Sequence, residues 1–282
     1  MTPGTDAGRS RGTPVQTRGT GRRIVLVTSL VLVVVVLVPP VGTWARRYEF
    51  VEALQFSVLA VVVPALAVVG APWRLLGLAS ARAVPLDEDG GWASDPDALG
   101  AAERLALGRG RHPEVLRSAG FAVVFLAAAV LWRIPATVDA LARHPWLVVV
   151  EAVTLVGAGV GLWLELVESP PLIPRLSRPN RVALAAITMW VIWILAYLVG
   201  LSHASWYHAY AHHAGSGFSL SADQQLTTGV MWFVSGCAFV PVVFWNLIRW
   251  LQAEEDPDEE MHRLIRTERI RGSTVDRGGS TA

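Results

Sequence analysis

The chain has 282 residues, of which 52% are hydrophobic and 17% charged, and its mean hydropathy is +0.43. Soluble domains carry about 25% charged residues, so this composition excludes an ordinary soluble protein. The net charge of +1 comes without a basic tract interleaved with aromatic residues, which argues against a nucleic-acid partner. All 24 basic residues are arginine, a bias that indicates a GC-rich bacterial genome. The single cysteine, Cys237, excludes an intramolecular disulfide and a paired-thiol metal site.

Residues 1–23 are rich in Gly, Thr and Arg and have too little apolar surface to fold, so they are expected to form a disordered tail. Six apolar segments follow, each near the length of about 20 residues that crosses a bilayer as a helix. Their expected bounds are 24–41, 50–71, 119–134, 146–166, 181–201 and 226–251. Lipid cannot satisfy exposed backbone groups, and the runs lack the alternation of barrel strands. The predicted fold is an all-α, multi-pass helix bundle in the lipid bilayer over residues 24–251.

A second tail, residues 252–282, contains a stretch at 261–270 with the pattern of a basic amphipathic helix. Arginine is concentrated in the two tails and in the loops after the second and fourth segments, whereas residues 202–227 contain none. The positive-inside rule therefore predicts a bacterial inner-membrane protein with both termini in the cytoplasm. The first segment could instead be a signal peptide cleaved after Ala45, but its length and two prolines favour an anchor.

Four polar residues fall within the outer third of the predicted spans. They are Glu52, Gln55, Arg133 and Glu151. Charges within a span are costly and mark candidate functional positions. The first two are three residues apart and so share a helix face. The alternative is that Arg133 forms a buried ion pair with one of the glutamates, which would fix how two helices dock. Gly157 and Gly161 form a GxxxG pattern, which predicts a close helix contact.

The outer loop is rich in candidate metal ligands. It contains His203, His208, His212 and His213. His208 and His212 are four residues apart, so a helical turn would direct both imidazoles at one copper or zinc ion. Met231 and Cys237 on the last segment are soft side chains that Cu(I) would accept. The alternatives are a solvated loop that binds no metal and a packing role for the cysteine.

Several motifs occur in a characteristic order. Residues 64–72 read PALAVVGAP, residues 132–135 read WRIP, and residues 161–163 read GLW. The longest block comprises Tyr207-His-Ala-Tyr210, Asp223-Gln224-Gln225 and Met231-Trp232. This series resembles the PLLVLGAP, W-H-x-P, G-L-x-F-W, Y-x-x-Y, D-Q-Q and M-W motifs of the CtaG-type cytochrome c oxidase assembly protein family. The resemblance covers about residues 41–250.

The resemblance implies a membrane accessory factor for cytochrome c oxidase assembly, with oxidase subunits or copper chaperones as partners and copper delivered at the outer face. It implies that the tyrosines and the D-Q-Q motif organise the outer loop. The family's first helix is absent, and three of its histidines are replaced by Gln55, Arg133 and Ala152, so any copper site must use Glu52, Glu151 and the loop histidines. The alternatives are a copper-binding or copper-transport protein and a metal-free scaffold. No nucleophile–base pair, phosphate loop or paired catalytic carboxylates occur, so we expect no enzyme.

Overall fold

The computed structural model describes residues 17–75, 114–169, 172, 174, 176–201, 207–211 and 219–255. Within these ranges the chain is almost wholly helical, which confirms the predicted all-α class. The amphipathic stretch expected at 261–270 lies outside the described residues, as do residues 1–16 of the expected N-terminal tail, whereas residues 17–23 of that tail are helical. The elements in chain order are α1 (Thr17–Leu37), α2 (Val41–Trp44), α3 (Glu49–Ser57), η1 (Val58–Val62), α4 (Val63–Gly70), α5 (Pro72–Leu75), α7 (Glu114–Arg133), α8 (Pro135–Arg143), α9 (Leu147–Leu166), α10 (Arg178–Gly200), α11 (His208–Ala211) and α12 (Leu220–Glu255).

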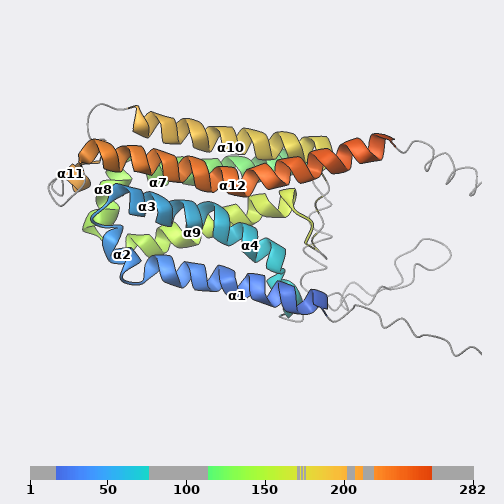
Figure 1. Ribbon diagram of the computed structural model, residues 1–282, viewed down its shortest axis with the longest axis horizontal. Helices are drawn as coiled ribbons and strands as arrows, with labels where there is room; N and C mark the ends of the chain where they lie inside the picture. Colours follow the sequence, from blue (N-terminus) through green and yellow to red (C-terminus); the bar gives the residue numbers. More distant parts are fainter. Residues whose placement is uncertain are drawn as a thin grey trace, which may run out of the picture.

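Six helical stretches in the described part are long and apolar enough to cross a membrane, which confirms the predicted number. They are Thr20–Leu37, Glu49–Gly70, Val115–Arg133, Leu147–Leu166, Arg178–Gly200 and Leu220–Gln252. The helices run side by side as one bundle (Figure 1). A multi-pass membrane protein follows from this arrangement, because each stretch can satisfy its own backbone groups within lipid.

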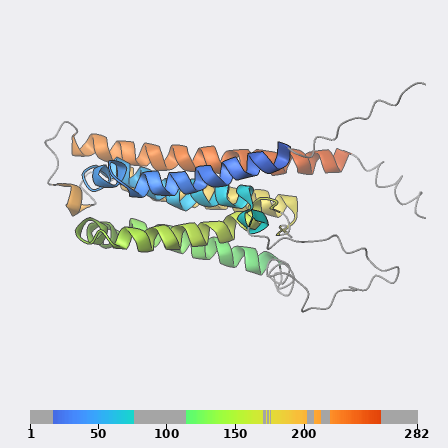
Figure 2. The same cartoon turned by 90° about the horizontal axis from the view of Figure 1, so that it is seen from below.

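The second span is the centre of the bundle. Buried residues make up 67% of its most apolar window, against at most 33% in the other five spans. Viewed from below, α7 and α9 lie on one side and α1 and α12 on the other (Figure 2). The central span is continuous but irregular, because the π-helical turn η1 separates α3 from α4. Pro64 is the second residue of α4, and a proline has no N–H and disrupts regular α-helical bonding.

The central span packs closely against α9 at the irregular turn. A Cβ atom added to Gly159 would lie 2.6 Å from Pro64 Cγ and 2.8 Å from the carbonyl oxygen of Ala60, so only glycine fits there. Gly161 is equally close to α7, since its Cβ would lie 2.7 Å from a ring carbon of Phe121. A Cβ on Gly157 would meet nothing within 4 Å. The GxxxG prediction was therefore wrong for Gly157, and the contact with the central span is made by Gly159.

The bundle has two distinct ends. The short helices α2, α8 and α11 lie together at one end, which we call the α8 end (Figure 1). The beginning of α1 and the end of α12 lie at the other, which we call the α5 end because α4 leads into α5 there (Figure 1). Both ends of the described chain are thus on the same side, as six spans require. The cytoplasmic location of that side stays a prediction.

Candidate functional site

Arg133 is the central residue of the α8 end. It is the last residue of α7, and extended Ile134 and Pro135, the first residue of α8, follow it. Pro135 favours that extended conformation of the residue before it, which ends α7. The Arg133 side chain is buried, with 1% of the residue exposed, and its Nη1 forms an ion pair with Oε2 of Glu52. Of the two glutamates considered from the sequence, Glu52 is therefore the partner.

Two aromatic rings complete the surroundings of this guanidinium. Its central carbon lies 5.0 Å from the ring centroid of Phe56 and 5.5 Å from that of Tyr207, within the range of cation–π contacts. The Nε and Nη2 atoms have no hydrogen-bond partner among the described residues. Arg133 thus connects α7 to α3 and to the segment before α11, and its charge is only partly satisfied.

Three buried glutamates lie near this arginine, which can balance the charge of only one of them when they are ionised. Glu49, Glu52 and Glu151 are 2%, 5% and 2% exposed. In each of them Oε1 is buried and has no hydrogen-bond partner in the described part of the chain. Glu49 was not among the candidates from the sequence. Its position three residues before Glu52, and therefore on the same helix face, is the signal that could have found it.

A cavity of about 140 Å³ adjoins these acids. Its polar lining consists of Glu52, Gln55, Glu151 and Tyr210, with exposed Arg46 also at its wall. The remaining wall is largely apolar and comes from α1, α2, α8 and α9 and from the residues between α8 and α9. Four of the predicted site residues therefore converge on one space.

Gln55, which lines the cavity, also links α3 to the end of α1. Its Nε2 donates a hydrogen bond to the carbonyl oxygen of Val36, at 2.9 Å. A continuing α1 helix would satisfy that carbonyl from the residue four positions later, but this residue is Pro40, which has no N–H. Gln55 therefore completes the end of α1 and holds it against α3.

Two buried tyrosines satisfy other carbonyl groups. The Tyr207 hydroxyl donates to the carbonyl oxygen of Arg133 at 3.2 Å, and the Tyr210 hydroxyl donates to that of Ala45 at 2.9 Å. Burial raises the pKa of Tyr207 to about 12, although Arg133 acts to lower it. Burial also raises the pKa of Tyr210 well above its usual value, and the negative charge of Glu52 adds to this. Both phenols are therefore protonated donors at neutral pH.

The D-Q-Q motif contributes two buried residues and one exposed residue. Asp223 accepts hydrogen bonds from the backbone N–H groups of Glu49 and Phe50, both at 2.9 Å, and so caps the N-terminus of α3 from α12. Gln224 Nε2 donates to the carbonyl oxygen of Val199, near the end of α10, at 2.6 Å. Gln225 is exposed and joins neither contact. The first two residues of the motif hold the bundle together at this end.

A residue that sequence reasoning left out of the site positions α11. Asp139 of α8 accepts a hydrogen bond from the backbone N–H of Ala209 at 2.9 Å. Its second carboxylate oxygen lies 3.6 Å from Nδ1 of His208, whose side chain is 87% exposed. His208 is therefore presented at the surface of the α8 end. His203, His212 and His213 lie outside the described residues.

The candidates on the last span do not join this site. Met231 is fully buried in the hydrophobic core, whereas Cys237 is exposed, so the two soft side chains do not form a pair of ligands. Trp232 is also exposed, and its ring packs against that of Trp193 with centroids 4.6 Å apart. Among the described residues no group of three or more His, Cys, Asp or Glu side chains is placed to hold a metal ion.

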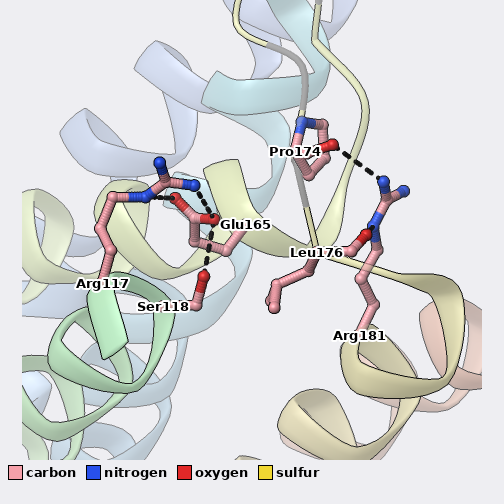
Figure 3. A network of polar contacts seen from close by, with 6 residues as sticks. All are labelled: Arg117, Ser118, Glu165, Pro174, Leu176 and Arg181. Atoms are coloured by element: carbon pink, nitrogen blue, oxygen red, sulfur yellow. Dashed lines mark hydrogen bonds and ion pairs between the residues drawn. The ribbon is translucent and has the colours of Figure 1, made fainter. Parts of the chain in front are cut away.

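The polar network at the α5 end differs from the site in being fully bonded. Both carboxylate oxygens of Glu165 accept hydrogen bonds, from Arg117 at 3.0 and 3.3 Å and from Ser118 at 2.9 Å (Figure 3). Nearby, Arg181 donates to the carbonyl oxygens of Leu176 and Pro174 (Figure 3). These groups are satisfied as structural contacts require. The glutamates of the α8 end differ from Glu165, because in the described part of the chain Oε1 of each has no hydrogen-bond partner.

A family model described as cytochrome c oxidase caa3 assembly factor (Caa3_CtaG) matches residues 4–253. The chain belongs to this family. No curated protein and no solved structure gives a significant match. Within the Caa3_CtaG fold, the positions where the sequence resemblance implies histidine are grouped at the α8 end. Gln55 lines the cavity, and Arg133 forms an ion pair with Glu52, which also lines it. Buried Ala152 follows Glu151 in α9.

Proposed function

We propose that this member of the caa3 assembly factor family assists oxidase maturation by binding an oxidase subunit or a copper chaperone at its α8 end, on the outer side of the bacterial inner membrane. The observation that carries the proposal is the set of long-range contacts made by Asp223, Arg133 and the two buried tyrosines. These contacts fix α3, α7, α11 and α12 relative to one another at this end. A fixed surface is what a binding partner requires.

The experiment is a deletion strain complemented with variants of the chain. We expect the deletion to lower the amount of spectrally mature aa-type oxidase and the wild-type chain to restore it. A photo-crosslinking residue at His144, exposed beside α8, should capture an oxidase subunit or copper chaperone. The same residue at Gln252, exposed near the other end of α12, is the matched control. Normal oxidase in the deletion strain would refute the proposal.

Transient copper binding is a second candidate, supported by the exposure of His208 beside Asp139. Its Nε2 would face the solvent side, and the loop histidines His203, His212 and His213 would supply further ligands. We expect the double substitution of His208 and His212 to alanine to lower the copper bound per purified protein. His144→Ala is the control, because His144 is exposed at the same end in a different connection. Unchanged copper would favour a metal-free scaffold.

Copper transport through the last span is a weaker candidate. It would need Met231 and Cys237 to act in succession, yet one faces the core and the other faces away from it. Replacing Cys237 by serine should leave copper uptake by cells unchanged. A loss of uptake in this variant would favour transport over delivery at the outer face.

A further inference from the structure

The cavity at the α8 end combines a charge imbalance with an unfilled space. Glu49, Glu52 and Glu151 face a single buried guanidinium, that of Arg133, so their ionised forms leave two negative charges uncompensated. Asp223 does not add to this imbalance, because two backbone N–H groups and the N-terminus of α3 stabilise its charge. Arg46 is exposed at the wall of the cavity, so water and mobile ions screen its charge.

The oxygen atoms around the cavity are available as ligands. Oε1 of Glu52 and Oε1 of Glu151 are buried and accept no hydrogen bond in the described part of the chain. The side-chain nitrogen of Gln55 donates a hydrogen bond to the carbonyl oxygen of Val36, so the side-chain oxygen of Gln55 is available to bind a cation. The Tyr210 hydroxyl donates a hydrogen bond to the carbonyl oxygen of Ala45, and its oxygen lone pairs remain available.

We propose that this cavity is a binding site for a hard divalent cation, held by Glu52, Glu151, Gln55 and Tyr210. Carboxylate, amide and hydroxyl oxygens are the ligands that Ca²⁺, Mg²⁺ and Mn²⁺ prefer, whereas copper(I) prefers thiolate, thioether and imidazole. A divalent ion balances the two excess negative charges. The volume of about 140 Å³ holds an ion together with water molecules that complete its coordination.

The chemistry of the wall excludes the other classes of ligand. An anion would meet two carboxylates, and a lipid chain would leave Oε1 of Glu52 and Oε1 of Glu151 buried without a partner, at a cost of several kcal/mol. The site is separate from the proposed copper position, because His208 is exposed and is not part of the cavity wall. The inference therefore does not depend on the proposed function.

Mn²⁺ is the probe for the test, since its electron paramagnetic resonance signal distinguishes free from bound ion. The full chain in lipid nanodiscs should bind one Mn²⁺, which Ca²⁺ should displace. Glu151→Gln keeps the size of the side chain and removes its charge, so we expect the affinity to fall at least about tenfold. Tyr210→Phe removes one neutral ligand and should cause a smaller loss. Glu168→Gln is the control, because Glu168 is a half-exposed acid at the α5 end.

Two results would overturn the cation site. One is the absence of bound Mn²⁺ at millimolar concentration and pH 8, since the acids would then hold protons instead of a metal ion. The other is binding that neither Glu151→Gln nor Tyr210→Phe weakens. Circular dichroism checks that each variant is folded. The two variants test the same site through different ligands, a carboxylate in Glu151→Gln and a hydroxyl in Tyr210→Phe. Oxidase maturation in cells is a separate readout, so failure of the cation site leaves the proposed function intact.

Discussion

Replacing Asp223 by alanine should destabilise the bundle more than any other single change in the D-Q-Q motif. Asp223 lies on α12 and caps α3, which is 173 residues away along the chain. The first turn of a helix has N–H groups without an intrahelical partner, and here the local N-cap residue, Tyr48, gives no side-chain bond. Asp223 accepts from two of these groups, so its removal leaves both without their acceptor.

The size of the effect follows from the burial of the two bonds. A buried N–H that loses its partner costs about 1–3 kcal/mol, and bonds to a charged acceptor are at the upper end of this range. The bond from Glu49 is buried and that from Phe50 is partly buried, so the second contributes less. We expect Asp223→Ala to lower the free energy of unfolding by about 3 kcal/mol. Asp223→Asn keeps one acceptor oxygen and should cost about half as much.

Unfolding in mixed micelles with increasing SDS, followed by circular dichroism, measures these free energies. Gln225→Ala is the matched control, because Gln225 is exposed two residues further along the same motif and should change stability by less than about 0.5 kcal/mol. If Asp223→Ala is no more destabilising than Gln225→Ala, then the cap contributes nothing and the role given to the motif is incorrect.

Three further predictions concern other contacts and the topology. Arg133→Leu leaves Glu52 unpaired and should lower the free energy of unfolding by about 3–5 kcal/mol in the same assay. Replacing both residues by leucine should recover most of this loss. If the losses of the two single variants instead add in the double variant, the two residues do not form a specific pair. Gly159→Ala should cost about 1–3 kcal/mol because its Cβ overlaps the central span, and stability equal to the wild type would contradict this packing. In a cysteine-free background, a membrane-impermeant maleimide should label His144→Cys in intact cells and Gln252→Cys only after lysis; the reverse pattern would invert the topology.

Hydropathy determined most of what the sequence could predict about the fold. Apolar runs of bilayer length predicted six spans, because backbone N–H and C=O groups in lipid must be hydrogen-bonded within a helix. The cost of an unpaired charge in a span also raised the alternative that Arg133 pairs with a glutamate, and the structure shows this pair. Choosing between Glu52 and Glu151 required the structure, since both lie on spans at the same depth and only packing determines which one contacts α7.

Contacts between residues distant in sequence were beyond prediction. The bond from Asp223 to the start of α3 depends on how α12 lies against α3, which no local pattern encodes. The GxxxG pattern indicated Gly161, which packs closely against α7, but also Gly157, which meets nothing within 4 Å, and it missed Gly159, which packs against Ala60 and Pro64 of the central span. Met231 and Cys237 were grouped by chemistry alone, although six residues along a helix place them on different faces.

The two polar networks of the bundle suggest different physical roles. At the α5 end Glu165 has partners on both oxygens, so its charge is satisfied and its contribution is structural. At the α8 end Arg133 supplies a permanent positive charge at a position where the sequence resemblance implies histidine, and its ion pair with Glu52 is a direct contact between two side chains. The contacts of Asp223, Gln55 and the tyrosines are also independent of a bound ion. The α8 end can therefore fold before an ion arrives, and an ion in the cavity would bind to a preformed set of oxygen atoms.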